Sequence, residues 1–479
     1  MDLTHYLNGE QLIAKRDQIK RIFFYRVCGT GMGAAACLLK EKGLHIEGGD
    51  TQFYPPMSDY LKSTGIPCHN LKDFDVKRLS EFDLIVVGNV VPRKSDDAAM
   101  IEKCGVEFCS FPAALGAFVL KDANVVGIAG THGKTTTTYF ATQMFERLAQ
   151  EPGYLIGGVM EGRPSAKLGG GKYFFIESDE YDSCYFEKFS KFQSYEIDHL
   201  LLTSLEFDHA DIFKDLDAIK LEFRNLFAKV TKGITYCSDY QPIIDLHNES
   251  VEHYKDLYWQ TYGNNDQHGP KILEVSESGT VFELKGARYK SNVVGIHNIL
   301  NLSSVILFAL SEGFSKEQID SAITNLKMVR RRQELRGHYQ GTPVIDDFAH
   351  HPKAVELTLQ GLKLSYPGKK LLVVMEANSA TARSNIFQKE FEQALHQADE
   401  VLFAKPARPT SVSWAGNLDI EAMAKNLTAI DKPSLVIENL AALRLEIDRR
   451  LTDQSLLVVL SNGTCLGLWE SDFVQALKA

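Results

Sequence analysis

A buried strand that runs directly into a glycine turn and a helix is the strongest constraint on the fold of this chain. The strand is predicted at Asn124-Val-Val-Gly-Ile-Ala129, and a helical pattern follows from Thr135 to Leu148. Between them lie the turn Gly130-Thr-His-Gly133 and Lys134. Backbone N–H groups of such a turn, together with the helix N-terminus, bind phosphate oxygens. The segment therefore predicts an α/β domain with a nucleoside triphosphate site.

The side chains of this turn suit phosphate binding. Lys134 would reach the β- and γ-phosphates, and the Thr135 hydroxyl would hold Mg²⁺. The motif is the short Gly-Thr-x-Gly-Lys-Thr-Thr form, because Ile128 stands where the longer phosphate-loop pattern has its first glycine. A helix-opening glycine turn with an exposed lysine is the structural alternative. The candidate ATP-binding residues here are Gly130, Thr131, His132, Gly133, Lys134, Thr135 and Thr136.

Acidic residues follow two further predicted strands. The strand Tyr173 to Ile176 delivers Glu177 to its carboxyl end, where ligands of open α/β sheets collect. The strand Leu200 to Ser204 is followed by Glu206, Asp208 and His209. Alone, such residues are usually helix caps or loop residues. Beside a phosphate loop they predict carboxylates that hold the metal of a bound triphosphate.

The rest of the chain repeats this α/β pattern. Its 479 residues argue for about three domains, because a single hydrophobic core stops growing well below this length. Strands alternate with helical patterns, so we expect α/β architecture with largely parallel sheets. Further strands are predicted at Arg21–Val27, His45–Gly49, Asp83–Gly88, Pro343–Asp347, Lys370–Met375, Glu400–Ala404, Ser434–Ile437 and Ser455–Leu460, and a helix at Met32–Lys42. The expected domains are a Rossmann-like domain at 1–122, a P-loop ATPase domain at 123–326 and a second Rossmann-like domain at 327–479.

A second glycine turn lies in the first domain. Cys28-Gly-Thr-Gly-Met-Gly33 follows a predicted strand and opens a helix, and Asp50 follows the next strand. That layout is typical of a crevice for a nucleoside diphosphate. It fits a dinucleotide cofactor as readily as a UDP-sugar, and a purely structural tight turn is the third alternative.

Composition excludes several classes of protein. The chain is 44% hydrophobic and 24% charged, which gives no support to a disordered or coiled-coil protein. Its formal charge of −10 disfavours nucleic-acid binding. No apolar run is long enough to cross a membrane and the N-terminus is not a signal peptide, so we expect a cytoplasmic protein. The eight cysteines form no Cys-x-x-Cys pair and are expected to be reduced, mostly buried thiols.

Three segments near residue 330 carry further polar groups. They are Gly295-Ile-His-Asn-Ile-Leu-Asn301, Arg330-Arg-Arg-Gln-Glu-Leu-Arg336 and Val344-Ile-Asp-Asp-Phe-Ala-His-His-Pro352. Consecutive arginines are usually solvated, and His-His-Pro is usually a turn. If the third domain closes over the nucleotide, an arginine there neutralises phosphoryl charge, an aspartate holds the ribose and the asparagine amides read adenine.

Taken in order, these motifs resemble the Mur ligases of bacterial cell-wall synthesis. The resemblance rests on Gly-Thr-His-Gly-Lys-Thr-Thr, Glu177, Asp208-His209, Gly295-x-His-Asn-x-x-Asn301, Arg331-Arg332 and Asp346-Asp347-x-x-His-His-Pro352. It implies an N-terminal UDP-binding domain, a central ATPase domain and a C-terminal domain that receives the amino compound. It also implies that ATP phosphorylates a carboxylate, which an amine then attacks.

The resemblance also implies a role for each matching residue. The catalytic set is Lys134, Glu177, His209 and Arg332. Thr135 and Glu177 would bind one Mg²⁺ and His209 a second. For ATP, Asn298 and Asn301 would contact adenine, Arg332 the γ-phosphate, and Asp346 or Asp347 the ribose. Gly29, Thr30, Gly31, Met32, Gly33 and Asp50 would hold the UDP-sugar, and His350 would lie near the acceptor.

Four stretches are most similar to the branch of the family that adds the tripeptide L-Ala-γ-D-Glu-meso-diaminopimelate to UDP-N-acetylmuramate in cell-wall peptide recycling. They are Tyr54-Pro-Pro-Met-Ser58, Ile176-Glu-Ser-Asp-Glu-Tyr-Asp182, Glu187-Lys-Phe-Ser-Lys-Phe192 and Leu205-Glu-Phe-Asp-His-Ala-Asp-Ile-Phe213. A ligase that adds L-alanine and a non-catalytic sensor of UDP-sugar or nucleotide are the alternatives. The expected partners are ATP, UDP-N-acetylmuramate, the tripeptide and two Mg²⁺, without nucleic acid or membrane, and the expected state is a monomer.

The sequence departs from the family pattern at two positions. Several relatives carry a carbamylated lysine where this chain has Phe223, and Lys220 lies one turn earlier. Relatives also place an arginine two residues after the glutamate of Met375-Glu-Ala-Asn378, where this chain has asparagine. Arg383 or Arg93 is the candidate replacement for binding an acceptor carboxylate.

Overall fold

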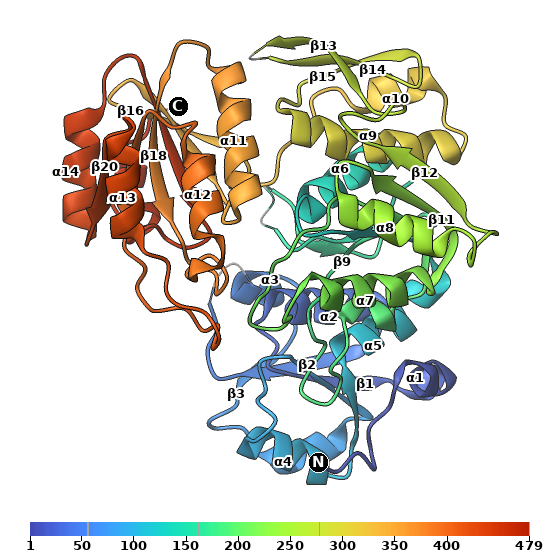
Figure 1. Cartoon of the computed structure of the whole chain (residues 1–479). Coiled ribbons are helices and arrows are strands. Elements are labelled where there is room, and N and C mark those ends of the chain that lie inside the picture. The colour runs from blue at the N-terminus through green and yellow to red at the C-terminus, as the bar shows by residue number, and fades with distance from the viewer. Residues whose placement is uncertain (55–56, 159, 161, 277, 479) are drawn as a thin grey trace. The chain divides into compact units, whose positions relative to one another are not determined.

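The computed structural model describes residues 1–54, 57–158, 160, 162–276 and 278–478 (Figure 1). The chain divides into two compact units. The first contains Met1–Leu205, Ile219–Asp266 and Ser304–Ala322, and the second contains Glu206–Ala218, Gln267–Ser303 and Ile323–Ala479. Among the described residues, no helix has the length and apolar character needed to cross a bilayer.

The first unit begins with a five-stranded sheet in the order β3-β2-β1-β4-β5. All of its strand pairs are parallel. Its strands are β1 (Arg21–Tyr25), β2 (His45–Asp50), β3 (Cys68–Asn70), β4 (Leu84–Val87) and β5 (Glu107–Ser110). The helices of this part are α1 (Gly9–Lys15), α2 (Thr30–Glu41), α3 (Met57–Ser63), α4 (Asp96–Lys103) and α5 (Phe111–Phe118).

A seven-stranded sheet in the order β12-β11-β10-β6-β9-β7-β8 completes this unit. Its strands are β6 (Asn124–Ala129), β7 (Gly153–Leu155), β8 (Ala166–Lys167), β9 (Tyr173–Ser178), β10 (Ile197–Leu202), β11 (Val230–Cys237) and β12 (Tyr258–Tyr262). Only the short β7–β8 pair is antiparallel among the described pairs. The associated helices are α6 (Lys134–Arg147), α8 (Gln241–Ser250) and α10 (Lys316–Ala322). Two more, α7 (Leu216–Phe227) and α9 (Ile296–Ser311), begin in the second unit and continue in the first from Ile219 and Ser304.

Aromatic packing fixes α6 on this sheet. The ring of Phe145 lies 4.8 Å from that of Tyr173, 4.9 Å from that of Phe175 and 5.4 Å from that of Phe308, measured between centroids. Such contacts add to the free energy gained by removing the rings from water. The packing therefore holds the last turn of α6 against the first half of β9.

The second unit contains an antiparallel sheet of β13 (Lys271–Ser276), β14 (Gly279–Leu284) and β15 (Ala287–Ser291) and a larger six-stranded sheet. The larger sheet has the order β16-β17-β21-β18-β19-β20 and is parallel except for the β16–β17 pair. Its strands are β16 (Glu334–Tyr339), β17 (Thr342–Asp347), β18 (Lys370–Glu376), β19 (Glu400–Ala404), β20 (Ser434–Ile437) and β21 (Ser455–Ser461).

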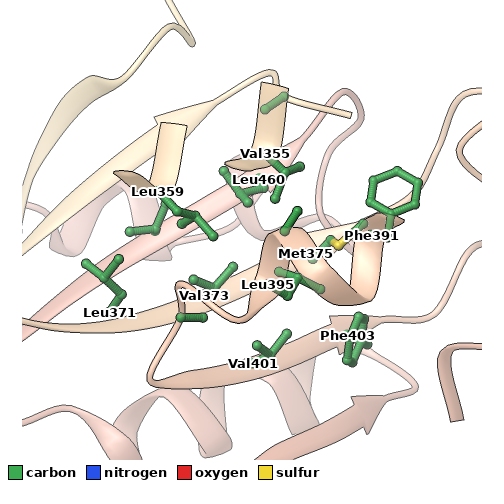
Figure 2. Packing of buried hydrophobic residues seen from close by; sticks show 14 of the residues in the cluster. Val355, Leu359, Leu371, Val373, Met375, Phe391, Leu395, Val401, Phe403 and Leu460 are labelled. Carbon is green, nitrogen blue, oxygen red and sulfur yellow. The ribbon is translucent and has the colours of Figure 1, made fainter. Parts of the chain in front are cut away.

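Helices cover the two faces of this larger sheet. They are α11 (Pro352–Ser365), α12 (Gln388–Leu395), α13 (Ile420–Ala429), α14 (Leu440–Arg450) and α15 (Phe473–Ala476). Val355 and Leu359 of α11 and Leu395 of α12 pack with Val373 and Val401 of the strands in one core cluster (Figure 2). Residues of α14 and α15 join a second cluster with other residues of the same strands. Helices on both faces of a mainly parallel sheet make this a doubly wound domain.

The structure confirms the predicted α/β class and the mainly parallel sheets. Each strand named from the sequence is present within a few residues of its predicted ends. The antiparallel sheet β13–β15 was not predicted, because its three short strands lie in a polar stretch where hydrophobic residues show no strong periodicity. The domain boundaries near residues 122 and 326 stay predictions. All eight cysteines are free thiols, and most are buried as expected.

Candidate active site

Two glycines shape the loop between β6 and α6. Gly130 has a φ of +134°, and Gly133, which caps α6, has a φ of +86°. A Cβ atom on Gly130 would lie 2.5 Å from Thr203 Oγ1 and 2.7 Å from the carbonyl oxygen of Ser204. A larger residue at 130 would therefore displace the loop from the end of β10.

Thr203 and Ser204, just after β10, hold this loop in place. The His132 N–H donates to Ser204 Oγ at 2.7 Å, and Thr203 Oγ1 donates to the His132 carbonyl at 2.5 Å. The Thr131 N–H donates to the Ser204 carbonyl at 3.2 Å. Sequence reasoning assigned no role to these two residues. The only sequence feature that could have indicated them is a Thr-Ser pair at the end of a strand. The pair reaches the loop because β10 lies beside β6, which the sequence does not show.

Lys134 is held by one carbonyl and two carboxylates. Its Nζ donates to the Gly130 carbonyl at 2.5 Å and lies 3.4 Å from Glu180 Oε2 and 3.8 Å from Asp179 Oδ1. Burial alone would lower the pKa of Lys134, but the charges of Glu180, Asp179 and Glu177 raise it above the ordinary lysine value. The lysine is therefore positively charged in the folded protein. Glu180, itself buried, was missed from the sequence because several acids follow β9.

Thr135 and Glu177 meet as predicted. Thr135 Oγ1 donates to Glu177 Oε2 at 3.0 Å, and the Gly157 N–H donates to Glu177 Oε1 at 2.6 Å. Burial, followed by the charge of Asp179, raises the pKa of the Glu177 carboxyl. A hydroxyl and a carboxylate oxygen side by side next to a phosphate loop form the hard donor set that Mg²⁺ prefers. The residues present therefore fit a magnesium ion. Thr136, the next predicted ATP residue, is buried within α6.

The glycine turn of the first sheet is tightly packed. Thr30 begins α2, and the buried Met32 follows it. A Cβ atom on Gly33 would lie 2.2 Å from the sulfur of Met57, and one on Gly31 would lie 3.1 Å from the ring of Phe111. Close packing therefore explains why both positions are glycine, with or without a bound ligand.

Asp50 stands at the end of β2 beside this turn. Its Oδ2 accepts a hydrogen bond from the Cys28 N–H at 2.9 Å, and its Oδ1 lies 3.7 Å from Arg26 Nη1. Asp50 therefore supports the turn, and its contact with a UDP-sugar stays a prediction. In the nearby stretch Tyr54–Ser58, Pro55 and Pro56 lie outside the described residues.

In the second unit, the segment after residue 205 contacts residues that follow β17 and residues that follow β18. The Ala210 N–H donates to Thr381 Oγ1 at 3.1 Å, and His351 Nδ1 lies 3.7 Å from Glu206 Oε2. Burial opposes ionisation of Asp208, but the charges of His209, His350 and His351 hold its pKa well below the ordinary value. These residues form a group of one aspartate and three histidines. Its members come from two of the predicted motifs.

The group contains both predicted histidines. His209 has a φ of +55°, and its carbonyl accepts from the Ile212 and Phe213 N–H groups. His350 Nδ1 lies 2.9 Å from the Phe348 carbonyl oxygen. Because Lys134, Thr135 and Glu177 belong to the first unit, a role for His209 in binding a second Mg²⁺ stays a prediction.

Arg331 and Arg332 share the ring of Phe348, whose centroid lies 5.4 Å and 5.0 Å from their guanidinium carbons. Arg331 Nη2 also donates to the carbonyls of Ser461 and Gly463, at 2.6 Å and 2.8 Å. These hydrogen bonds give Arg331 a structural role. Arg332 remains the candidate for contact with phosphate.

Asp346 and Asp347 are both buried at the end of β17. Asp346 Oδ2 accepts from Arg336 Nη1 at 3.0 Å and lies 3.4 Å from Arg331 Nε. Burial nevertheless raises the pKa of Asp346 to about 6. The two oxygens of Asp347 accept from the N–H groups of Gln333 and Ala349, each at 2.7 Å. Both aspartates therefore have internal partners, and contact with ribose stays a prediction.

The predicted adenine residues lie on α9. Asn298 and Asn301 are buried within one turn of each other. Asn298 Nδ2 donates to the Val294 carbonyl at 3.0 Å. This hydrogen bond fixes the amide orientation, which is what recognition of a base edge requires.

The two positions that depart from the family pattern have structural partners. Phe223 is fully buried, and its ring lies 5.9 Å from that of Phe192. Lys220 Nζ donates to Asp245 Oδ2 at 2.8 Å. Arg383 is buried and donates through Nε to the Pro409 carbonyl at 3.1 Å and through Nη1 to the Asn378 carbonyl. Such contacts stabilise loops, so binding of an acceptor carboxylate by Arg383 or by the exposed Arg93 stays a prediction.

Comparison with known families identifies three matching segments. The sequence model described as Mur ligase family, catalytic domain, matches residues 21–122. The Mur ligase middle domain matches residues 128–309, and the Mur ligase glutamate ligase domain matches residues 331–463. The three matches follow one another in the order expected for a three-domain α/β ligase.

Individual proteins agree with these matches. The UDP-N-acetylmuramate–L-alanyl-γ-D-glutamyl-meso-2,6-diaminoheptandioate ligase of Haemophilus influenzae is 34% identical over 414 residues, which cover 83% of this chain and 87% of that protein. A UDP-N-acetylmuramate–L-alanine ligase of Lactobacillus johnsonii is 28% identical over 418 residues, 86% of this chain and 90% of that protein. The crystal structure of a murein peptide ligase from Psychrobacter arcticus superposes with a TM-score of 0.66 at 27% identity and covers 95% of this chain and 98% of that one.

Proposed function

Because the chain belongs to the Mur ligase family of ATP-dependent ligases that form amide bonds, we propose that it joins a peptide to UDP-N-acetylmuramate. The proposed acceptor is the tripeptide L-Ala-γ-D-Glu-meso-diaminopimelate, and the proposed role is reuse of cell-wall peptides in the cytoplasm. The observation that carries the choice of acceptor is identity to relatives. It is 34% for a ligase named for the tripeptide and 28% for one named for L-alanine.

The first step is transfer of the γ-phosphoryl group of ATP to the lactyl carboxylate of the sugar nucleotide, which forms an acyl phosphate and releases ADP. Both reactants are anionic, so the protein must position them and neutralise their charge. The N–H groups of the Gly130–Gly133 loop would bind phosphate oxygens. Lys134, charged and already beside the loop, would follow the transferred group. Arg332 would add a second positive charge.

Magnesium would be held by Thr135 Oγ1 and Glu177, whose oxygens lie 3.0 Å apart. When bound, Mg²⁺ would supply positive charge that offsets the negative charge of the transferred phosphoryl group. His209 is the proposed ligand of a second ion. In the protein alone, Glu177 keeps the Thr135 hydroxyl oriented toward this position.

The second step forms the amide bond. The amine of the tripeptide attacks the carbonyl carbon of the acyl phosphate, a C–N bond forms, and the tetrahedral intermediate expels inorganic phosphate while the amine loses its proton. His350, with its ring held at the Phe348 carbonyl, is the proposed residue near this amine. Since an acyl phosphate also reacts with water, the site must exclude solvent during this step.

An acceptor panel tests this proposal. Phosphate release from ATP and UDP-N-acetylmuramate is measured with the tripeptide, with L-alanine and with no acceptor. We expect release with the tripeptide and none above background with L-alanine. Preference for L-alanine would replace the proposal with the biosynthetic ligase. ATP or UDP-sugar binding without turnover on any acceptor would instead make the chain a sensor.

A further inference from the structure

Arg332 is flanked by two residues with left-handed backbone. Arg331 has a φ of +61° and Gln333 has a φ of +50°. Residues with a Cβ atom adopt this region at a cost of about 1 kcal/mol or more each. Such strain persists only where surrounding contacts hold the backbone. The segment Arg331–Gln333 is therefore held in one shape by the rest of the second unit.

The contacts that hold the segment come mainly from the end of β17. The Gln333 N–H donates to Asp347 Oδ2 at 2.7 Å, and the Arg331 carbonyl accepts from the Phe348 N–H at 2.8 Å. The Arg331 N–H donates to Glu334 Oε2 at 2.7 Å. Both neighbours of Arg332 are thus fixed by hydrogen bonds, and this places its guanidinium over the ring of Phe348.

The side chain of Gln333 extends in the other direction, toward the start of α9. Its Nε2 lies 3.3 Å from Nε2 of His297, the residue before Asn298. Loss of hydration around the imidazole, together with the positive charge of Arg332, lowers the pKa of His297 to about 4. The ring is therefore neutral at physiological pH. A neutral ring accepts a hydrogen bond from the Gln333 amide when Nε2 carries no proton.

The amide of Gln333 packs close to two glycines. A Cβ atom on Gly295 would lie 3.7 Å from Gln333 Oε1, and one on Gly361 of α11 would lie 3.5 Å from Gln333 Nε2. The amide of Gln333 is therefore enclosed by α11, by the start of α9 and by the ring of His297. A side chain of this length reaches the ring without displacing either helix.

We infer that Gln333 is a positioning residue that sets Arg332 relative to Asn298. Its backbone N–H is bound by Asp347 beside Arg332, and its side chain contacts the residue next to Asn298. One residue thereby links the group proposed for phosphate to the group proposed for adenine. This inference rests on the proposed function, because it assumes that both groups bind ATP.

The test replaces Gln333 with glycine, which accepts a positive φ and removes only the side chain. The matched control is Gln340→Gly, because Gln340 also has a positive φ, of +51°, and contacts Asp448 away from these groups. We expect Q333G to weaken ATP binding about tenfold in equilibrium titration, since a partly buried hydrogen bond to His297 is lost. The KM for UDP-N-acetylmuramate should stay unchanged. Q340G should bind both ligands as the unaltered protein does.

A double-mutant cycle with His297→Asn separates a specific effect of the Gln333–His297 contact from a general destabilisation of the protein. If the two side chains act through their contact, the effects of Q333G and H297N on ATP affinity will not add. Should Q333G fail to fold, weakened ATP binding by H297N with normal UDP-sugar binding supports the inference, and normal ATP binding overturns it. Normal ATP affinity in a folded Q333G protein overturns it too. ATP binding without turnover on any acceptor would overturn only the proposed function.

Discussion

Thr135 Oγ1 donates a hydrogen bond of 3.0 Å to Glu177 Oε2, and this pair joins the start of α6 to the end of β9. If these oxygens bind magnesium, Glu177→Gln and Thr135→Val should each lower turnover by about 100-fold or more at saturating ATP. Raising Mg²⁺ should partly restore T135V, which keeps the carboxylate. Steady-state assays across a magnesium series measure this. Thr138→Val is the control, because the Thr138 hydroxyl donates only to the Lys134 carbonyl within the helix. Equal loss in T138V would contradict a metal role.

Lys134 and the buried Glu180 form an ion pair that should affect both stability and catalysis. Lys134→Met should abolish phosphate release and leave UDP-N-acetylmuramate affinity within about twofold, because the two ligands are expected in different domains. It should also reduce the free energy of unfolding by about 3 kcal/mol, since the buried Glu180 loses the positive charge of Lys134. In K134M/E180Q most of that stability should return while turnover stays absent. Denaturant unfolding and calorimetry measure the two effects. Lost UDP-sugar affinity would argue against the assignment of Lys134.

Glu47 predicts a pH dependence of stability. Burial alone would raise its pKa, but hydrogen bonds from His69 and His45 and the charge of Arg78 lower it below the ordinary 4.5. A lowered pKa in the folded state means that the carboxylate stabilises the fold above pH 4.5 and that this contribution disappears as pH falls through the folded value. Glu47→Gln should therefore be less stable than the unaltered protein at pH 6, and the difference should close below about pH 4.

Thermal unfolding across this pH range provides the measurement for Glu47. Glu252→Gln serves as the control, because the Glu252 carboxylate is exposed and its ion pair with Lys255 is solvated. Exposed pairs of this kind contribute little to stability. If the difference in stability between E47Q and the unaltered protein stayed constant with pH, the contacts of Glu47 with His45 and His69 would not depend on the charge of Glu47.

Arg383 should matter for stability more than for acceptor binding. Arg383→Met loses the hydrogen bonds to the Asn378 and Pro409 carbonyls, and we expect it to cost about 1–3 kcal/mol of unfolding free energy. The acceptor KM should change by less than about twofold in the folded fraction. Arg408→Met, at an exposed neighbouring position, is the stability control. Normal stability combined with a greatly raised acceptor KM would return Arg383 to the acceptor site.

The parts of the fold that were predicted correctly are local in the chain. The strand Asn124–Ala129, the glycine turn and Lys134 follow one another, so their shape depends on glycine conformations and on hydrophobic period within about 25 residues. Glu177 was also identified, because a strand of known length delivers its last residue to a known edge of the sheet. The structure brings Glu177 to Thr135 for that reason.

The residues that were missed depend on partners far away in sequence. Thr203 and Ser204 bind the loop between β6 and α6 because β10 lies next to β6. The order of strands in the sheet cannot be predicted from the residues of either strand alone. Glu180 lies beside Lys134 because the chain turns after β9. The hydrophobic pattern of the sequence does not distinguish Glu180 from the other acidic residues that follow this strand. In the sequence, Gln333 belongs to an arginine-rich segment and nothing connects it to His297. The fold brings the two side chains into contact.

By itself, then, the sequence determined the α/β class, the strand, glycine turn and helix at residues 124–147, and the family, because these depend on residues close together in the chain or on motifs in a set order. The tertiary structure decided which side chains support those motifs. It paired Lys134 with Glu180, Asp347 with the Gln333 amide, and Arg383 with backbone carbonyls. The physical reason is that hydrogen bonds and ion pairs act over about 3–4 Å, and strand order and helix crossovers set those distances.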